Sequence, residues 1–239
     1  QPFTCNPTDP EFKEHIEKFA AICRVVNGMK RCNIGAIGAR TTAFKTVRFD
    51  EIAMQNVGIN VETIDLAEVF ARMEKIEQER VDAKVIDYLA ITDFGKYPMK
   101  KLETIARIGV AIDDLICEYD LQGIALRCWN EFETKFGVAP CLVLCDLNER
   151  GIAASCELDV NNTVMTRAIS LAAAHPTMLL DVNNNFGKDP NKCIFFHCGP
   201  VPISMTEGKG TTIEHLMFKK SFGEGSGVGA NKVKIATGP

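Results

Sequence analysis

The feature that most constrains this chain is a regular alternation of short apolar runs with longer amphipathic segments. Apolar runs of strand length occur at 32–38, 59–66 and 123–128, and each is followed by apolar residues that recur at helical spacing. Strands that alternate with helices in this way pair in parallel, and helices cover both faces of their sheet. The chain is therefore predicted to be α/β, a parallel-sheet sandwich of the Rossmann or flavodoxin-like kind.

The other elements follow from the same spacing and from the glycines and prolines that interrupt it. Helices are expected at 8–30, 51–57, 66–88, 98–119, 129–136 and 156–174, and strands at 32–38, 59–66, 123–128, 139–144, 178–182 and 192–198. The polar segment 183–191 is expected to be a loop between the last two strands. From Gly199 onward the chain is rich in Gly and Thr, which indicates β-structure with turns, or mobile chain.

These elements predict three segments. Residues 1–32 hold a lone helix before the first strand, as expected for a link from a preceding domain. Residues 33–174 make up the α/β domain. Residues 175–239 are expected to begin a β-rich C-terminal domain that continues past Pro239.

Composition excludes several classes of protein. Hydrophobic residues make up 46% and charged residues 24%, as in a globular protein with a sizeable core. The net charge is −4 and no basic stripe is present, so nucleic acid is not an expected partner. No apolar run approaches the roughly 18 residues that span a bilayer, so no membrane contact is expected.

The ten cysteines are expected to be reduced. Six of them lie in apolar or strand-like stretches, where free cysteine packs as a small hydrophobe: Cys117, Cys128, Cys141, Cys145, Cys156 and Cys193. No Cys-x-x-Cys pair occurs, so a structural zinc site is not expected. This usage favours a cytoplasmic protein over a secreted disulfide scaffold.

Two carboxylates follow apolar, strand-like runs. Glu157 comes after Ala153–Cys156, and Asp181 comes after Met178–Leu180. Binding sites in parallel α/β sheets gather where strands end, and a buried carboxylate is costly unless it is paired or binds a metal. The alternative is that each carboxylate caps the helix or turn that follows.

His197 ends the next apolar run and precedes Cys198-Gly199. Alone it is expected more often as a hydrogen-bonded core histidine than as a ligand. Together with Glu157 and Asp181 it makes a set of carboxylate and imidazole donors, which suits Mn(II) or a similar divalent ion.

Three further residues are candidates for sugar binding. Asn183 opens an Asn run whose amides can bind hydroxyl groups, although Asn also favours turns. Trp129, the only Trp, can stack on a sugar ring or pack in the interior. Arg40 follows a Gly-containing strand end and can meet a polyol or anionic ligand, or be solvated.

Five ordered motifs carry a family resemblance. They are IGAIGARTTAFKTVR at 34–48, RCWNE at 127–131, ASCELD at 154–159, LDVNNNFG at 180–187 and FHCG at 196–199. In this order the chain resembles the L-fucose/L-arabinose isomerase-like family over nearly its whole length. The family's Glu and Asp match Glu157 and Asp181, and the gap of 24 residues (181 − 157) agrees with the family spacing.

The resemblance implies a metal-dependent aldose–ketose isomerase, an intramolecular oxidoreductase that works through an ene-diol. It implies manganese, acid/base roles for both carboxylates, a sugar substrate such as L-fucose or L-arabinose, and a homo-oligomer, a trimer or hexamer. The family's third ligand is a distant C-terminal His, expected past Pro239. His197 is therefore either the third ligand in this chain or a partner that contacts the ligands. For the same reason, an inactive isolated chain is a second expectation.

Two alternatives stay open. One is a sugar-binding or regulatory relative without catalysis. The other is an aldolase or epimerase on the same scaffold, because its intermediate is similar.

Overall fold

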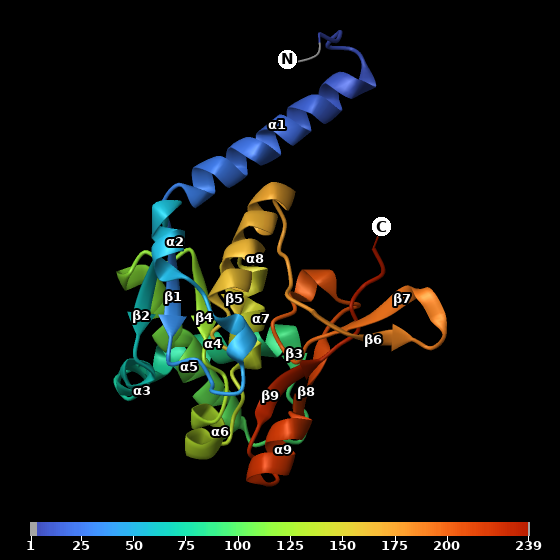
Figure 1. The fold of residues 1–239 in the computed structure, drawn as a ribbon. Coiled ribbons are helices and arrows are strands. Elements are labelled where there is room, and N and C mark those ends of the chain that lie inside the picture. The colour runs from blue at the N-terminus through green and yellow to red at the C-terminus, as the bar shows by residue number, and fades with distance from the viewer. Residues whose placement is uncertain (1–3, 239) are drawn as a thin grey trace.

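The computed structural model describes residues 4–238, and its centre is a four-stranded parallel sheet (Figure 1). The strand order is β2-β1-β4-β5, and the strands are β1 (Cys32–Ile37), β2 (Ile59–Ile64), β4 (Gly123–Leu126) and β5 (Ala153–Ser155). The α/β prediction is confirmed. Residues 1–3 and 239, which the expected end segments include, lie outside the described residues.

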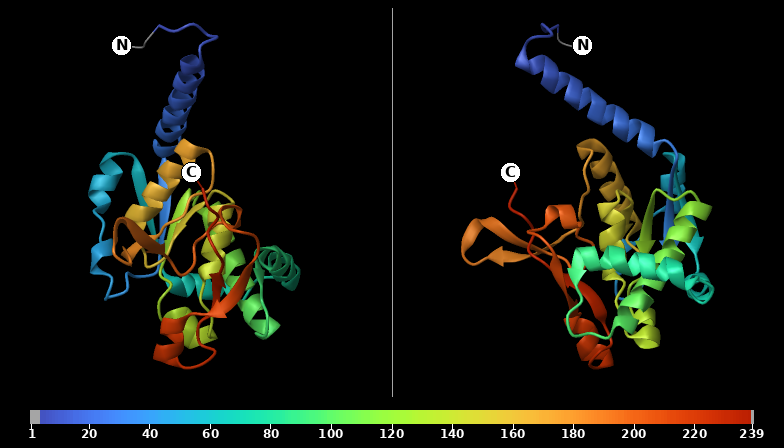
Figure 2. Two further views of the ribbon diagram at one scale, coloured as in Figure 1. Left: turned by 90° about the vertical axis from the view of Figure 1, so that its right-hand side faces the viewer. Right: turned by 180° about the vertical axis from the view of Figure 1, so that it is seen from behind.

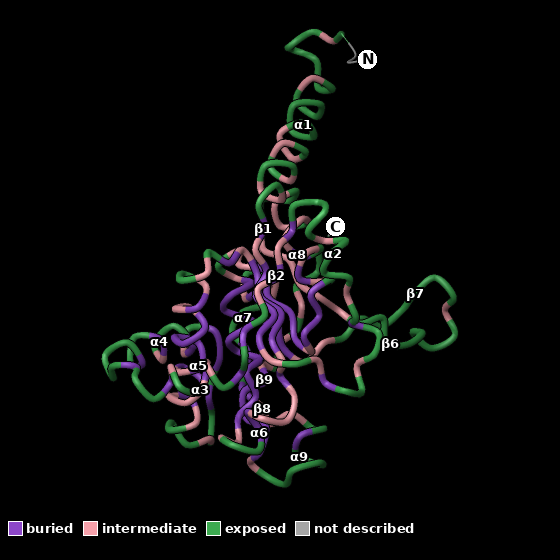
Figure 3. The backbone as a smooth tube through the Cα atoms, turned by 60° about the vertical axis from the view of Figure 1, so that its left-hand side comes forward, coloured by how far each residue is buried: buried purple, intermediate pink, exposed green. Residues whose placement is uncertain are grey.

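Helices cover both faces of this sheet. Alternate strand residues point to opposite sides, so the apolar strands present an apolar surface on each face that the helices bury. Ile124 and Leu126 join one apolar cluster, and Ala125 between them joins another. The described helices are α1 (Pro10–Met29), α2 (Glu51–Asn56), α3 (Leu66–Met73), α4 (Gln78–Ile91), α5 (Met99–Glu118), α6 (Glu131–Phe136), α7 (Cys141–Glu149), α8 (Val160–Ala173) and α9 (Leu216–Phe222). Short 3₁₀ turns occur at η1 (Lys45–Val47) and η2 (Ile203–Met205). Figure 3 shows the buried strands at the centre, surrounded by helices that carry both buried and exposed residues.

Two expected elements are wrong. Residues 139–144 were predicted as a strand, but helix α7 begins at Cys141 and eight of its nine residues are buried. A short apolar run buried on all sides has no period that distinguishes strand from helix. The single helix expected at 66–88 is two helices, and the chain between them turns so that Ile76 enters the core.

The C-terminal third also differs from expectation. The strand expected at 178–182 begins instead at Asp181, and β6 (Asp181–Phe186) runs through the expected loop to pair with β7 (Asp189–Phe196) as an antiparallel hairpin. The turn uses Gly187 at φ +58°. The polar run Asn183–Asn185 therefore lies in a strand and not in a loop. The strand accommodates this polar run because all of its residues are exposed to solvent.

A second sheet joins distant parts of the chain. Strand β3 (Thr92–Asp93) pairs in parallel with β8 (Gly210–Glu214), which pairs antiparallel with β9 (Val228–Lys232). This sheet therefore crosses the position 174/175 at which the sequence predicts a boundary. The three-segment division stays a prediction.

Helix α1 extends away from the rest of the molecule (Figure 2). Its last turns rest on α8, where Gly28 lies against Leu171 and the Arg24 guanidinium donates to the Leu171 and Ala172 carbonyls at 2.8 and 2.7 Å. None of its residues is buried. No helix among residues 4–238 is long and apolar enough to cross a membrane.

All ten cysteines are free. Cys128, Cys141, Cys145 and Cys156 are buried as predicted. Cys117 and Cys193 are exposed, so the expectation that they lie in the core is wrong. Cys193 faces water because its strand belongs to the exposed hairpin.

Candidate active site

Glu157 lies in the tight turn between β5 and α8. Glu157 and Leu158 both have left-handed backbone, at φ +64° and +62°. For residues other than glycine this conformation costs about 1–2 kcal/mol each. The turn holds because Leu158 is buried and because the Asp159 carboxylate accepts from the Asn162 N–H at 3.0 Å to begin α8. Backbone strain is thus concentrated at the predicted catalytic residue.

The hairpin brings Asp181 and His197 together. Asp181 pairs in register with Phe196, so His197 is its near neighbour on the adjacent strand end. The Nδ1 atom of His197 lies 3.6 Å from the Asp181 Oδ2. That distance is an ion-pair contact rather than a hydrogen bond, and the buried Nδ1 has no hydrogen-bond partner.

His197 also connects the hairpin to the end of the parallel sheet. Its Nε2 atom lies 2.8 Å from the Sγ of Cys156, the residue before Glu157. Only 3% of the His197 side chain is exposed, whereas 68% of the Asp181 side chain is exposed. The structure therefore gathers Glu157, Asp181 and His197 into one region.

The two most buried members of this group have shifted pKa values. Burial raises the pKa of Glu157 to about 7, the charges of Cys198, Asp181 and Asp159 add to the rise, and His197 opposes it. Burial alone would lower the pKa of His197, but its interaction with the Cys198 thiol and the charges of Cys198, Asp181 and Glu157 raise the pKa overall. A carboxyl group that titrates near neutrality suits proton transfer at physiological pH.

A cluster of thiols and imidazoles borders these residues. The pKa of Cys198 is lowered because the Cys141 thiol hydrogen-bonds to it, and His197 and His215 act in the same direction. Sequence reasoning did not select Cys198, His215 or Cys141. The FHCG motif was the one available signal for Cys198, whereas His215 and Cys141 lie far from it in the chain.

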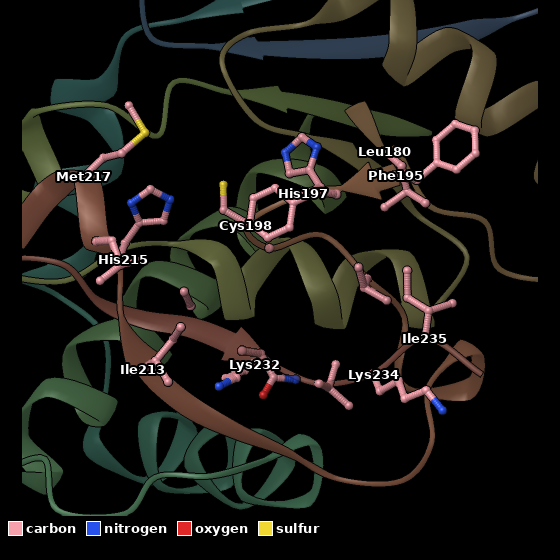
Figure 4. Close-up of a pocket in the computed structure, with 17 residues that line it drawn as sticks. Leu180, Phe195, His197, Cys198, Ile213, His215, Met217, Lys232, Lys234 and Ile235 are labelled. Atoms are coloured by element: carbon pink, nitrogen blue, oxygen red, sulfur yellow. The ribbon is translucent and has the colours of Figure 1, made fainter. Parts of the chain in front are cut away.

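A cavity of about 580 Å³ opens beside this cluster (Figure 4). Its wall runs from His197 and Cys198 at the end of β7 to His215 after β8. In Figure 4 the Cys198 side chain lies between the rings of His197 and His215. Most of the other lining residues are apolar, Lys232 supplies positive charge, and Lys234 is paired with Glu207 at 2.7 Å.

The three predicted sugar-binding residues lie elsewhere. Trp129 packs edge-on between Phe44 and Phe218, at centroid distances of 5.4 and 4.9 Å. The Arg40 guanidinium donates to the Phe44 carbonyl at 3.1 Å and so braces its own loop. Asn183 is exposed on the hairpin. None of the three lines the 580 Å³ cavity, and their roles in substrate binding stay predictions.

The predicted metal site fits in donor type and only partly in position. Two carboxylates and an imidazole nitrogen without a hydrogen bond are suitable ligands for a divalent ion. However, no group of three or more His, Cys, Asp and Glu side chains within residues 4–238 is arranged to hold a metal. Asp181 and His197 approach each other, and Glu157 interacts with both through its charge.

Comparison with known proteins points to one kind of enzyme. No protein-family model matches the chain. A sulfoquinovose isomerase of Alkalicoccus urumqiensis is 26% identical over 205 residues, which cover 84% of this chain and 45% of that protein. A second, of Priestia aryabhattai, is 25% identical over 241 residues, covering 96% of this chain and 52% of that protein.

The chain is similar to sugar isomerases. A third relative, of Clostridium sp. (strain MSTE9), has the same name and is 26% identical over 201 residues, which are 82% of this chain and 45% of that protein. The matches support the sugar-isomerase part of the expected resemblance, but not the L-fucose isomerase-like family specifically. The chain spans about half the length of the curated relatives it matches.

Proposed function

We propose that this chain carries the acid/base residues of a metal-dependent aldose–ketose isomerase that works through an ene-diol intermediate. Similarity to proteins named sulfoquinovose isomerase supports the reaction class. The observation that carries the proposal is the environment of Glu157: a strained turn, a pKa raised to about 7, and the His197–Asp181 pair beside it.

The reaction needs one group that removes a proton from the carbon next to the carbonyl and returns it to the neighbouring carbon. Glu157 is suited to this shuttle because its protonated and ionised forms are both populated near pH 7. Asp181 is the second acid/base group, and it also holds His197 through their ion pair. A divalent ion such as Mn(II), held by Asp181 and His197 with Glu157, would polarise the sugar carbonyl when bound.

The proposed substrate is a sulfonated aldose of the sulfoquinovose type, with L-fucose and L-arabinose as the competing choices. The names of the relatives favour sulfoquinovose. A sulfonate is an anion, and Lys232 on the cavity wall is a group that could pair with it. We further propose a homo-oligomer, which the exposed apolar side chains of the β6–β7 hairpin support.

The test begins with Mn(II) binding to the chain, followed by assays on the three sugars. We expect binding that both Glu157→Gln and Asp181→Asn abolish, because each removes a ligand charge. Glu74→Gln, which changes an exposed acid at the end of α3, is the matched control and should bind as the unaltered chain does.

The outcomes separate the proposals. Binding with turnover of sulfoquinovose, measured as aldose consumed and ketose formed, supports the isomerase. Binding without turnover favours the non-catalytic relative, and a cleaved or epimerised product favours the alternative chemistry. Absence of Mn(II) binding, or binding that survives both substitutions, would show that this chain does not contain the proposed metal site.

A further inference from the structure

Two cysteine thiols far apart in the chain meet at the wall of the cavity. Cys141 is the first residue of α7, and Cys198 follows β7. The segment that carries Cys198 lies directly against the Cys141 side chain, as the neighbouring Gly199 shows. A second pair of thiols, Cys128 and Cys156, also interacts, but both of its members are buried.

The residue after Cys198 explains how the two segments come so close. A Cβ atom at Gly199 would lie 2.6 Å from the Cys141 Cβ and 2.9 Å from its Sγ. Both distances are shorter than real contacts, so a side chain at this position would push the segment away. Glycine at 199 therefore allows the backbone beside Cys198 to lie directly on Cys141.

The two thiols differ in access. Cys198 is half-buried and lines the 580 Å³ cavity, which can admit a small molecule. The imidazoles of His197 and His215 lie on either side of it (Figure 4). Cys141 is buried behind Cys198, so a reagent that enters the cavity meets Cys198 first. The exposed Cys117 and Cys193 lie outside this cavity.

We propose that Cys141 and Cys198 form a reversible disulfide, and that hydrogen peroxide or a similar small peroxide attacks Cys198 through the cavity. The Cys198 sulfur bonds to one peroxide oxygen, the O–O bond breaks, and one water leaves, which gives a sulfenic acid. The Cys141 sulfur then bonds to the Cys198 sulfur, the S–O bond breaks, and a second water leaves. Two thiols are oxidised and one peroxide is reduced to two waters.

The bond would connect the start of α7 to the end of β7. It would also take the Cys198 sulfur out of its contacts with His197 and His215. The proposal concerns thiol chemistry and does not depend on the isomerase reaction.

The experiment treats the full chain with one equivalent of hydrogen peroxide, blocks the remaining thiols with iodoacetamide, and maps peptides without reduction. We expect a cross-linked peptide that joins 141 to 198, lighter by two hydrogen atoms than its reduced parts, and its loss after dithiothreitol. Cys198→Ser should abolish the cross-link. Cys193→Ser, which removes an exposed thiol of β7, should leave it unchanged.

Other results would overturn the proposal. These are a cross-link between 128 and 156 alone, oxidation of Cys117 and Cys193 before Cys198, or sulfinic acid at Cys198 with no link to Cys141. The map of the unaltered chain decides these outcomes, so the test holds even if a substituted chain folds poorly. Gly199→Ala adds an independent check, because displacing the segment should slow formation of the cross-link.

Discussion

At the scale of single residues, Glu133 shows how burial changes a side chain's ionisation. Its side chain lies in α6 and only 2% of the residue is exposed. One oxygen accepts from the Asn130 N–H at 2.9 Å, and the other has no hydrogen-bond partner. Burial raises the pKa of this carboxyl to about 8. Folded Glu133 is therefore mostly protonated at pH 7, whereas in the unfolded chain it is ionised above about pH 4.5.

This difference predicts a loss of stability as pH rises. The unfolded state binds fewer protons than the folded state between pH 4.5 and about 8, so the free energy of unfolding should fall across that window. The slope for one group is at most about 1.4 kcal/mol per pH unit. Glu133→Gln keeps an acceptor for Asn130 but cannot ionise, so it should remove the part of the pH dependence that Glu133 causes. Urea unfolding at pH 5 and 8.5 measures it, and an equal slope in both proteins would contradict the prediction.

At the scale of elements, the start of α8 holds the turn that carries Glu157. The Asp159 carboxylate accepts from the Asn162 N–H at 3.0 Å, and one buried hydroxyl, Ser155, donates to the Asp159 carbonyl at 2.7 Å. Asp159→Ala removes the cap and should cost about 1 kcal/mol of stability. Asp159→Asn keeps an acceptor oxygen and is the control. Thermal unfolding gives the comparison, and equal losses in the two variants would show that the cap hydrogen bond is not the cause.

Helices of this chain also differ in how much their apolar residues contribute to the free energy of unfolding. Phe19 in α1 is 65% exposed, whereas Ile105 in α5 is fully buried. We expect Ile105→Ala to lower the free energy of unfolding by about 2–5 kcal/mol, because it leaves a cavity in the core. Phe19→Ala in the same chain should change it by less than about 0.5 kcal/mol. A large loss for Phe19→Ala would mean that α1 is covered in solution, which a concentration series would then reveal.

At the scale of the whole molecule, a network of charges joins three helices. The Lys84 ammonium in α4 lies 2.7 Å from the Asp113 carboxylate in α5 and 3.2 Å from the Asp146 carboxylate in α7. Arg150 contacts the same two acids at 2.6 and 3.0 Å. The Lys84 side chain is only 10% exposed. Removing one partner of a buried ion pair is costly because the charge that remains is poorly solvated.

Lys84→Met should therefore destabilise the fold by about 3 kcal/mol, at the low end for a broken buried pair because Arg150 still neutralises part of the charge. The matched control is Asp114→Asn, which breaks the more exposed Arg80–Asp114 pair and should cost less than about 1 kcal/mol. Equilibrium unfolding in urea measures both. Equal effects would mean that the Lys84 network contributes no more than a surface pair.

Some features of the fold were predictable because they depend on residues close together in the sequence. The strands at 32–37, 59–64 and 123–126 and the helix at 99–118 follow from local periodicity, and parallel pairing follows from their alternation with helices. The helix at 141–149 did not follow from local periodicity. A segment that is buried on every side lacks the apolar period that distinguishes a helix from a strand.

The candidate site was also predictable only in part. Local sequence and strand-end position, with the family resemblance, selected Glu157, Asp181 and His197, and the structure brings these residues into one region. The hairpin that does so was predicted as two strands and a loop, because a solvated run of Asn is equally compatible with a turn and an exposed strand.

Sequence alone determined which segments are apolar, which residue types are available, and therefore the α/β class of this protein. Only the tertiary structure decided that Cys141 lies against the segment of Cys198, that His215 lies beside Cys198, and that burial raises the pKa of Glu157 to about 7. The physical reason is that periodicity depends on neighbours along the chain. Contacts and desolvation depend instead on how segments more than fifty residues apart pack together, as Cys141 and Cys198 do.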